Sequence, residues 1–193
     1  MKGLEKQELT YVPDVVFHGD LIYEWTDENE GVCRLFYCGD HRYVGVDKGT
    51  VCIGNSEQEM VSFFVYHWLD EDIILNLVVS NKGLLSDEDN QNSQLERQID
   101  SINLVQFQGN SIYTWGDKYS GCEIFYTGDH RYICVDDAML GICDSEKEVT
   151  DFLVGFDASE ISEEILLGLI AARNEAAETV VVMSNNDQAE ETI

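Results

Sequence analysis

The chain has 193 residues, of which 11 are lysine or arginine and 38 are aspartate or glutamate, and its formal charge is −27. Hydrophobic residues make up 44% and aromatic residues 10%, which is typical of a folded protein rather than a disordered chain. So acidic a protein repels phosphate backbones and anionic lipids, which argues against direct nucleic-acid binding and against a membrane surface as its partner.

Residues 1–10 are polar and charged and lack the apolar segment of a secretory signal, so they are interpreted as an N-terminal extension. No apolar run in the sequence is long enough to span a bilayer. The six cysteines show no Cys-x-x-Cys pair and no zinc-ligand spacing. We therefore expect free thiols in a cytoplasmic protein, with no metal and no cofactor.

An internal repeat organises the chain. Residues 33–63 and 122–152, which are 89 positions apart, are identical at 15 of 31 positions. Residues 17–31 and 107–121, which are 90 positions apart, are identical at 7 of 15. Identity at this level over a fixed offset indicates a tandem duplication.

The repeat sets the predicted domain organisation. A first repeat covers residues 11–82 and a second covers 101–174. The segment between them, residues 83–100, is rich in Ser, Asp, Glu, Asn and Gln and is predicted to be a polar linker. Residues 175–193 are predicted to be an acidic tail that is partly disordered.

The first elements of each repeat are predicted to be strands. Residues 21–25, 33–37 and 43–47 combine aromatic and β-branched residues, and residues 111–115, 122–126 and 132–136 match them. Short further strands are expected at 51–53 and 140–142. Each repeat therefore begins with an antiparallel meander.

Helices are predicted after each meander. Ser56 with Glu59, and Ser145 with Glu148, have the spacing of a capping box. Apolar residues at helical spacing then predict two helices in each repeat. These residues are Met60, Phe63, Phe64 and His67, then Ile73, Ile74, Leu77 and Val78, and in the second repeat Val149, Phe152, Leu153 and Phe156, then Ile165, Leu166, Leu169 and Ile170. The predicted fold class is α+β: a tandem duplication of a β-meander followed by two helices, in a pseudo-two-fold arrangement.

A Gly-Asp-His-Arg motif lies between the second and third predicted strands of both repeats, at residues 39–42 and 128–131, and predicts a hairpin tip. Arginine offers a two-pronged donor that suits an anion or a carboxylate of a partner. A motif kept only because it forms the turn is the alternative. The candidate binding residues at these tips are Asp40, His41, Arg42, Asp129, His130 and Arg131.

Catalytic and metal sites are not expected. Neighbouring residues on a strand or turn point in different directions, so the Asp-His pairs do not form a dyad with each other. The sequence lacks Gly-x-Ser-x-Gly, His-Glu-x-x-His, a P-loop and Gly-x-Gly-x-x-Gly. Its acidic loops also lack the ligand pattern of an EF-hand.

Four aromatic residues, Trp25, Tyr43, Trp115 and Tyr132, occupy matched positions in the two repeats. Core packing is the favoured interpretation, because aromatic residues dominate buried area. Exposure on an uncovered sheet face is the alternative, and tyrosine and tryptophan among carboxylates would suit a basic partner.

Together these features favour a non-enzymatic acidic protein that occupies a basic surface of a partner protein, as a nucleic-acid mimic or an inhibitor of a nuclease or defence system. One alternative is a receptor or sponge for a small symmetric anion held by the paired hairpins. Another is a structural or assembly protein. A further alternative is that the acidity only maintains solubility. The sequence leaves open the oligomeric state and whether the repeats form one domain or two.

Overall fold

The computed structural model describes residues 3–27, 31–66, 95–116, 121–136 and 139–155, together with the single helical residues 76 and 168. It divides into two compact units. The first unit comprises Glu5–Gly109 with Ala138–Ile142, and the second contains Asn110–Asp137 and the chain from Cys143 onward.

The described residues are mainly β, with 69% in strands and 17% in helices. Strand order follows chain order from β1 to β8, with an additional pairing between β1 and β5. The strands are β1 (Glu5–Asp27), β2 (Gly31–Tyr37), β3 (Tyr43–Asp47), β4 (Thr50–Gly54), β5 (Leu95–Gly116), β6 (Gly121–Gly128), β7 (Arg131–Asp136) and β8 (Met139–Cys143), and the helices are α1 (Glu57–Tyr66) and α4 (Glu146–Gly155).

The prediction of an α+β unit with two helices after each meander is therefore wrong. One short described helix follows each meander. The residues expected to form the second helices, 73–78 and 165–170, lie outside the described part of the chain apart from 76 and 168.

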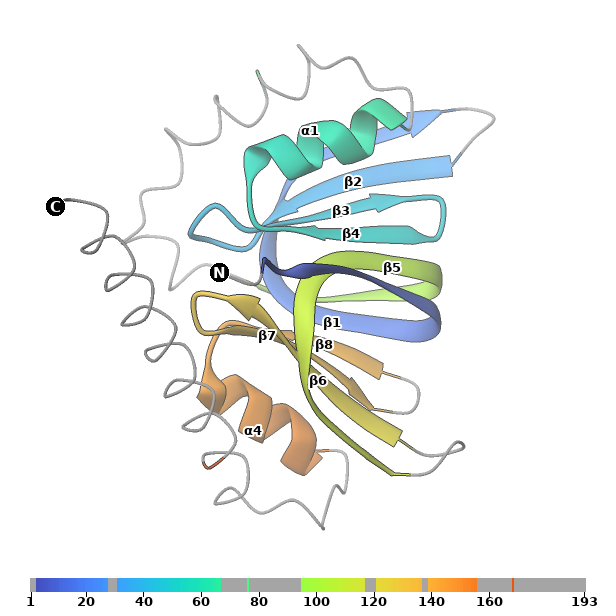
Figure 1. The fold of residues 1–193 in the computed structure, drawn as a ribbon. Coiled ribbons are helices and arrows are strands. Elements are labelled where there is room, and N and C mark those ends of the chain that lie inside the picture. Colours follow the sequence, from blue (N-terminus) through green and yellow to red (C-terminus); the bar gives the residue numbers. More distant parts are fainter. Residues whose placement is uncertain are drawn as a thin grey trace, which may run out of the picture. The chain divides into compact units, whose positions relative to one another are not determined.

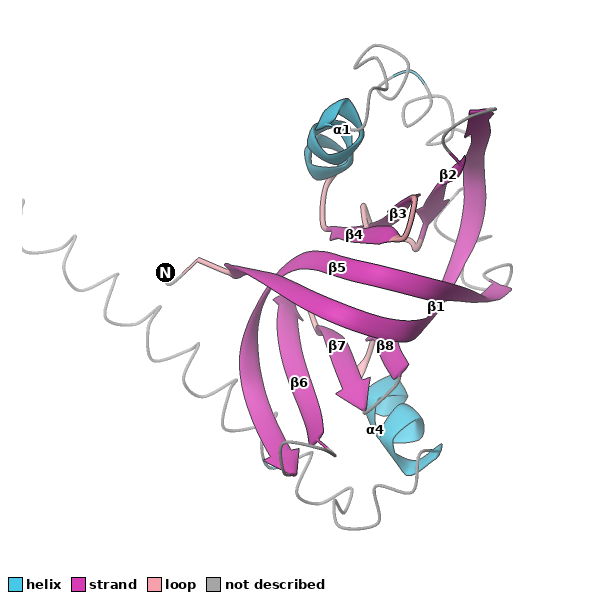
Figure 2. Ribbon diagram, turned by 90° about the vertical axis from the view of Figure 1, so that its right-hand side faces the viewer, coloured by secondary structure: helices cyan, strands magenta, loops and turns pink. Residues whose placement is uncertain are grey.

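Two long strands account for most of the difference between the predicted and the observed fold (Figure 2). β1 has 23 residues and β5 has 22. They pair with each other antiparallel from Glu5↔Gly109 to Gly19↔Leu95. Residues 5–10, expected as an extension, and residues 95–100, expected within a linker, belong to these strands.

Period-two burial is seen in the middle of both long strands. Val15 and Phe17 on β1, and Val105 and Phe107 on β5, are buried, while the side chains between them are more exposed. Such alternation is the pattern of a strand with one face on a core. Glu96, Gln98 and Asp100, which gave residues 95–100 a linker-like composition, are exposed.

The pairing of the strands follows the repeat. β4 pairs parallel with β5 at Thr50↔Leu104, and β8 pairs parallel with β1 at Met139↔Asp14. The register of β1 against β2 shifts between Leu21 and Tyr23, and that of β5 against β6 shifts between Ser111 and Tyr113. These matched irregularities are β-bulges, which bend a strand and raise its local twist. Each long strand thereby changes partner near its bulge.

The helix starts confirm the serine half of the predicted capping boxes. The backbone N–H of Glu59 donates to Ser56 Oγ at 3.3 Å, and that of Glu148 donates to Ser145 Oγ at 3.2 Å. Each glutamate reaches one residue beyond the cap, because Glu59 Oε2 accepts from the Asn55 N–H at 2.8 Å, and Glu148 Oε2 accepts at 2.9 Å from its Asp144 counterpart.

The two repeats differ in the sizes of the helix and sheet residues that pack against each other. Figure 1 shows α1 lying over the β2–β4 meander, and Met60 and Phe63 fill the space over Gly54 and Gly45 respectively. In the second unit the matched sheet residues are larger, Cys134 and Cys143. The helix residues there are smaller: Val149 matches Met60, and Leu153 matches Phe64, which together with Phe63 lies over Gly45. Volume-conserving exchanges of this kind preserve packing density.

Candidate functional site: the hairpin tips and the acidic ladder

The predicted hairpin tip is a tight turn between β2 and β3. Asp40 and His41 have φ of 48° and 58°, and the Arg42 N–H donates to the Gly39 carbonyl at 2.9 Å. Two successive central residues with positive φ define the type I′ turn, whose twist matches that of paired strands. Asp129 and His130 repeat the conformation, with φ of 48° and 59°.

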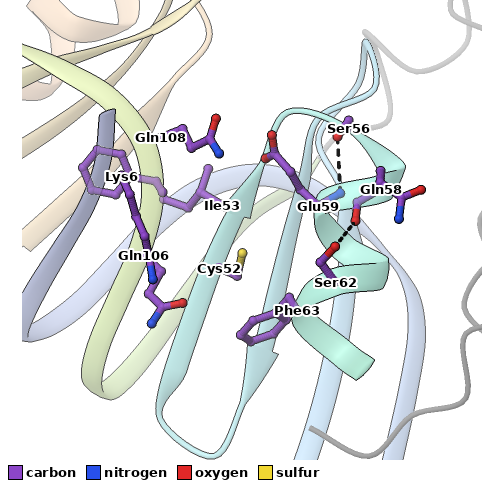
Figure 3. A pocket seen from close by; sticks show the side chains of 11 residues that line it. Lys6, Cys52, Ile53, Ser56, Gln58, Glu59, Ser62, Phe63, Gln106 and Gln108 are labelled. Carbon is purple, nitrogen blue, oxygen red and sulfur yellow. Dashed lines mark hydrogen bonds between the residues drawn. The ribbon is translucent and has the colours of Figure 1, made fainter. Parts of the chain in front are cut away.

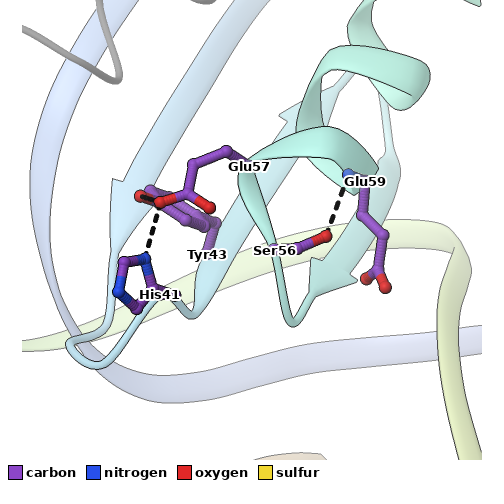
Figure 4. Close-up of polar contacts among 5 residues, drawn as sticks. All are labelled: His41, Tyr43, Ser56, Glu57 and Glu59. Carbon is purple, nitrogen blue, oxygen red and sulfur yellow. Dashed lines mark hydrogen bonds and ion pairs between the residues drawn. The ribbon is translucent and has the colours of Figure 1, made fainter.

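Each tip is tied to the first turn of the following helix. His41 Nδ1 lies 2.7 Å from Glu57 Oε1, and the Tyr43 hydroxyl donates to the same oxygen at 3.1 Å (Figure 4). Burial and the nearby Glu57 carboxylate raise the pKa of Tyr43 far above its ordinary value, so the phenol remains a donor.

The second repeat reproduces this contact. His130 Nδ1 lies 2.7 Å from Glu146 Oε1, and the Tyr132 hydroxyl donates to that oxygen at 2.8 Å. Partial burial raises the pKa of Glu146, but hydrogen bonds from His130, its own backbone and Tyr132 outweigh burial and hold the pKa below its ordinary value. Because Tyr132 is fully buried, the contact joins the helix start to the sheet.

The two arginines of the motif do not lie on the hairpin surface. Arg42 is 0% exposed and Arg131 is 7% exposed. A ligand that approaches either tip therefore meets Asp40 with His41, or Asp129 with His130, all of which are exposed. The guanidinium groups belong to the interior in this conformation.

The aromatic residues at matched positions of the two repeats are buried or half-buried where their side chains are described. Tyr43 and Tyr132 are 2% and 0% exposed. Trp25 is half-buried, with its ring centroid 6.3 Å from that of Phe64 on α1. The side chain of Trp115 lies outside the described part of the structure. Core packing, the favoured interpretation, describes Tyr43 and Tyr132.

The exposed face of the β1–β5 ladder gathers carboxylates. Asp14 lies directly opposite Asp100, and Glu96 opposite His18. Glu96 and Asp100 are exposed, and Asp14 is half-buried. Like charges at directly opposed positions destabilise a sheet. At the matched ladder position in the other half, Thr10 stands opposite Leu104, so the repeat fold does not require this acid pair. We call Asp14, Glu96 and Asp100 the acidic ladder.

The described basic side chains offset little of this charge. Arg42 and Arg131 are buried. Lys6 pairs with Glu8 at 2.9 Å and Arg34 with Glu24 at 2.7 Å, while Lys147 pairs with Asp151. Arg97 Nε donates to the Gly19 carbonyl at 3.2 Å. The acidic ladder thus has no arginine or lysine in a described ion pair with it.

The cysteines are all free, and five of the six are buried. Burial raises the pKa of the half-exposed Cys52 to about 12, which keeps it a thiol at neutral pH. Within the described ranges no three His, Cys, Asp or Glu side chains are grouped to hold a metal ion. No described helix is long and apolar enough to cross a membrane.

Sequence reasoning missed two features of these sites. Glu57 and Glu146 were assigned only to helix starts, although their spacing of 16 residues from the histidines recurs in both repeats. Asp14 and Asp100 gave no local signal, because only the long-range register of β1 and β5 brings them together.

Comparison of the chain with protein-family models, curated proteins and solved structures found no match in any of the three.

Proposed function

We propose that this protein is a non-enzymatic, cytoplasmic acidic binding protein whose acidic ladder occupies a basic surface of a partner protein. The favoured partner is a protein that binds nucleic acid, so that carboxylates take the place of phosphates and block the groove. The observation that carries the proposal is the opposed pair Asp14 and Asp100. Repulsion between these two carboxylates opposes folding. The fold does not require an acid pair here, because Thr10 and Leu104 stand at the matched ladder position.

The net charge supports the same conclusion. A chain of charge −27 generates a field that attracts basic surfaces and accelerates encounter with them. Because the described lysines and arginines are mostly buried or engaged in ion pairs and hydrogen bonds, that field is not locally cancelled at the acidic ladder. Free cysteines accord with a reducing compartment.

Affinity capture with a charge-matched pair of variants tests the proposal. The immobilised protein is exposed to lysate of its source at low and at high salt, and retained proteins are challenged with duplex DNA and with RNA. The variant Asp14→Asn/Asp100→Asn removes two charges from the acidic ladder. The control Asp40→Asn/Asp129→Asn removes two charges from the hairpin tips, where asparagine tolerates positive φ.

We expect a basic partner to be retained at low salt, released at high salt and displaced by nucleic acid. The ladder variant should lose this partner, while the control retains it. The ladder variant should also be as stable as the parent or more stable, by up to about 1 kcal/mol, since like charges across the ladder are removed. Equal loss in both variants would assign the acidity to nonspecific attraction.

A further inference from the structure

A pocket opens beside α1, on the same unit as the acidic ladder but at the other end of the β1–β5 pairing. Its volume is about 780 Å³, within the range of small-molecule sites. One wall carries Lys6, Gln106 and Gln108 from β1 and β5, and the opposite wall carries Gln58, Glu59 and Ser62 from α1 (Figure 3). The apolar part of the lining comes from Ile53, Phe63 and Phe107, with the Cys52 thiol beside them.

Several polar groups of the lining are already engaged. Ser62 Oγ donates to the Gln58 carbonyl at 2.8 Å, and Ser56 Oγ caps the helix. Glu59 Oε2 accepts from a backbone N–H. The side-chain amides of Gln58, Gln106 and Gln108 make no hydrogen bond among the described residues. Each primary amide presents a coplanar donor and acceptor.

The repeat shows that these amides are not needed for folding. The position matched to Gln106 is Val16, and the one matched to Gln108 is His18. By contrast, the residues that build the wall and floor are kept: Ser56, Glu59, Phe63, Ile53 and Phe107 match Ser145, Glu148, Phe152, Ile142 and Phe17. The two amides on β5 are therefore particular to this pocket, whereas those other lining residues recur in the second repeat.

Charge selects the class of ligand. Lys6 and Glu59 carry opposite charges: besides burial, Glu59 raises the pKa of the Cys52 thiol, and Lys6 lowers it. Lys6 is also paired with Glu8. In a protein of charge −27 an anionic ligand is repelled. A neutral molecule with a flat apolar face and an edge of alternating donors and acceptors fits the lining, because an amide can pair with such an edge through two hydrogen bonds.

We propose that this pocket binds an uncharged nitrogen heterocycle of the nucleobase or nucleoside class, recognised by the amides of Gln106 and Gln108. The site is separate from the acidic ladder, so binding here neither requires nor excludes a basic partner protein.

Nuclear magnetic resonance of the glutamine side-chain amides tests the assignment directly. The ¹⁵N-labelled full chain is titrated with adenosine, cytidine and uridine, with ribose and adenosine monophosphate as comparison probes. We expect at least one nucleoside to shift the side-chain amide signals of Gln106 and Gln108 saturably, with ribose inactive and the monophosphate weaker than adenosine.

Two valine variants provide the matched control. Gln106→Val introduces the residue found at the equivalent position 16, and it should weaken nucleoside binding roughly tenfold through loss of the paired hydrogen bonds. Gln98→Val makes the same change on the exposed face of β5 outside the pocket and should leave affinity unchanged. Well-dispersed spectra verify that both variants fold.

The proposal is overturned if none of the nucleosides shifts these signals, or if ribose binds as tightly as the nucleosides. It is also overturned if Gln98→Val weakens binding as much as Gln106→Val. None of these outcomes bears on capture of a basic partner, so failure here is distinguishable from failure of the function proposed above.

Discussion

Met60 on α1 occupies the space that a side chain on Gly54 of β4 would need. The matched positions in the second unit hold Val149 and Cys143, both buried in one cluster. The helix residue is larger where the sheet residue is smaller, so the pair has changed together between the repeats.

Substituting these two residues should therefore give coupled effects. Gly54→Cys forces a side chain into the volume of Met60 and should cost about 1–3 kcal/mol of unfolding free energy. Adding Met60→Val recreates the pairing of the second repeat and should recover much of that loss. Urea unfolding of the parent, both single variants and the double variant measures the coupling, expected at roughly 0.5–3 kcal/mol. Additive changes in unfolding free energy would contradict direct packing of Met60 against position 54.

The hairpin turn should reject β-branched residues. His41 has φ of 58°, a region that costs a β-branched residue roughly 1–2 kcal/mol. Both His41→Val and His41→Asn remove the contact with Glu57, but only asparagine tolerates this backbone conformation. We expect His41→Val to be the less stable variant in thermal or urea unfolding, whereas equal stability would argue against the type I′ turn.

Acid should weaken the contact between α4 and its hairpin. The depressed pKa of Glu146 means that its ionised form favours the fold. This stabilisation is fully present above the ordinary value of 4.5 and is lost as pH falls through the lower folded pKa. Because the Glu146 side chain is only partly buried, solvent screens the contact and we expect an effect below about 1 kcal/mol.

A pH series of urea unfolding measures this effect. Glu146→Gln should flatten the loss of stability below pH 4.5. Glu96→Gln, which alters an exposed carboxylate on β5, should leave that part of the profile unchanged. Identical profiles for the parent and Glu146→Gln would remove Glu146 from the acid response.

Substitutions of Asp20 and Arg97 should have coupled effects on the stability of the fold. Burial raises the pKa of Asp20 and Arg97 opposes the rise, while Asp20 Oδ2 is buried without a hydrogen bond. The matched positions hold the neutral residues Asn110 and Gln7, and Gln7 Nε2 donates to the Gly109 carbonyl at 3.1 Å as Arg97 Nε does to that of Gly19.

Arg97→Gln alone should destabilise the protein, because it leaves the partly buried carboxylate without its neighbouring cation. Adding Asp20→Asn should return the unfolding free energy to within about 1 kcal/mol of the parent. A double variant less stable than Arg97→Gln would contradict this relationship.

Features encoded within a few residues could be predicted from the sequence. The capping boxes at Ser56 and Ser145, the hairpin tips and the short strands of each meander follow from local turn and cap chemistry. The long strands escaped prediction because Glu96, Gln98 and Asp100 give the start of β5 the composition of a linker, although Ile99 between them is buried.

Features of the candidate sites that depend on tertiary pairing could not be predicted. Arg42 belongs to a motif typical of a surface turn, yet its side chain is buried, which the local turn pattern does not encode. The opposition of Asp14 and Asp100 depends on register between strands far apart in the sequence. The amides of Gln106 and Gln108 become a wall only because α1 lies across from β5.

The most direct test of acidic-ladder function is competition between this protein and nucleic acid for the captured partner. Labelled duplex DNA or RNA bound to the purified partner is titrated with the parent chain and with Asp14→Asn/Asp100→Asn over a series of salt concentrations. We predict complete displacement by the parent, with affinity for the partner falling steeply as salt rises, and weaker displacement by the variant. Simultaneous binding of protein and nucleic acid, or displacement that is equal for parent and variant, would contradict an acidic ladder that replaces phosphates.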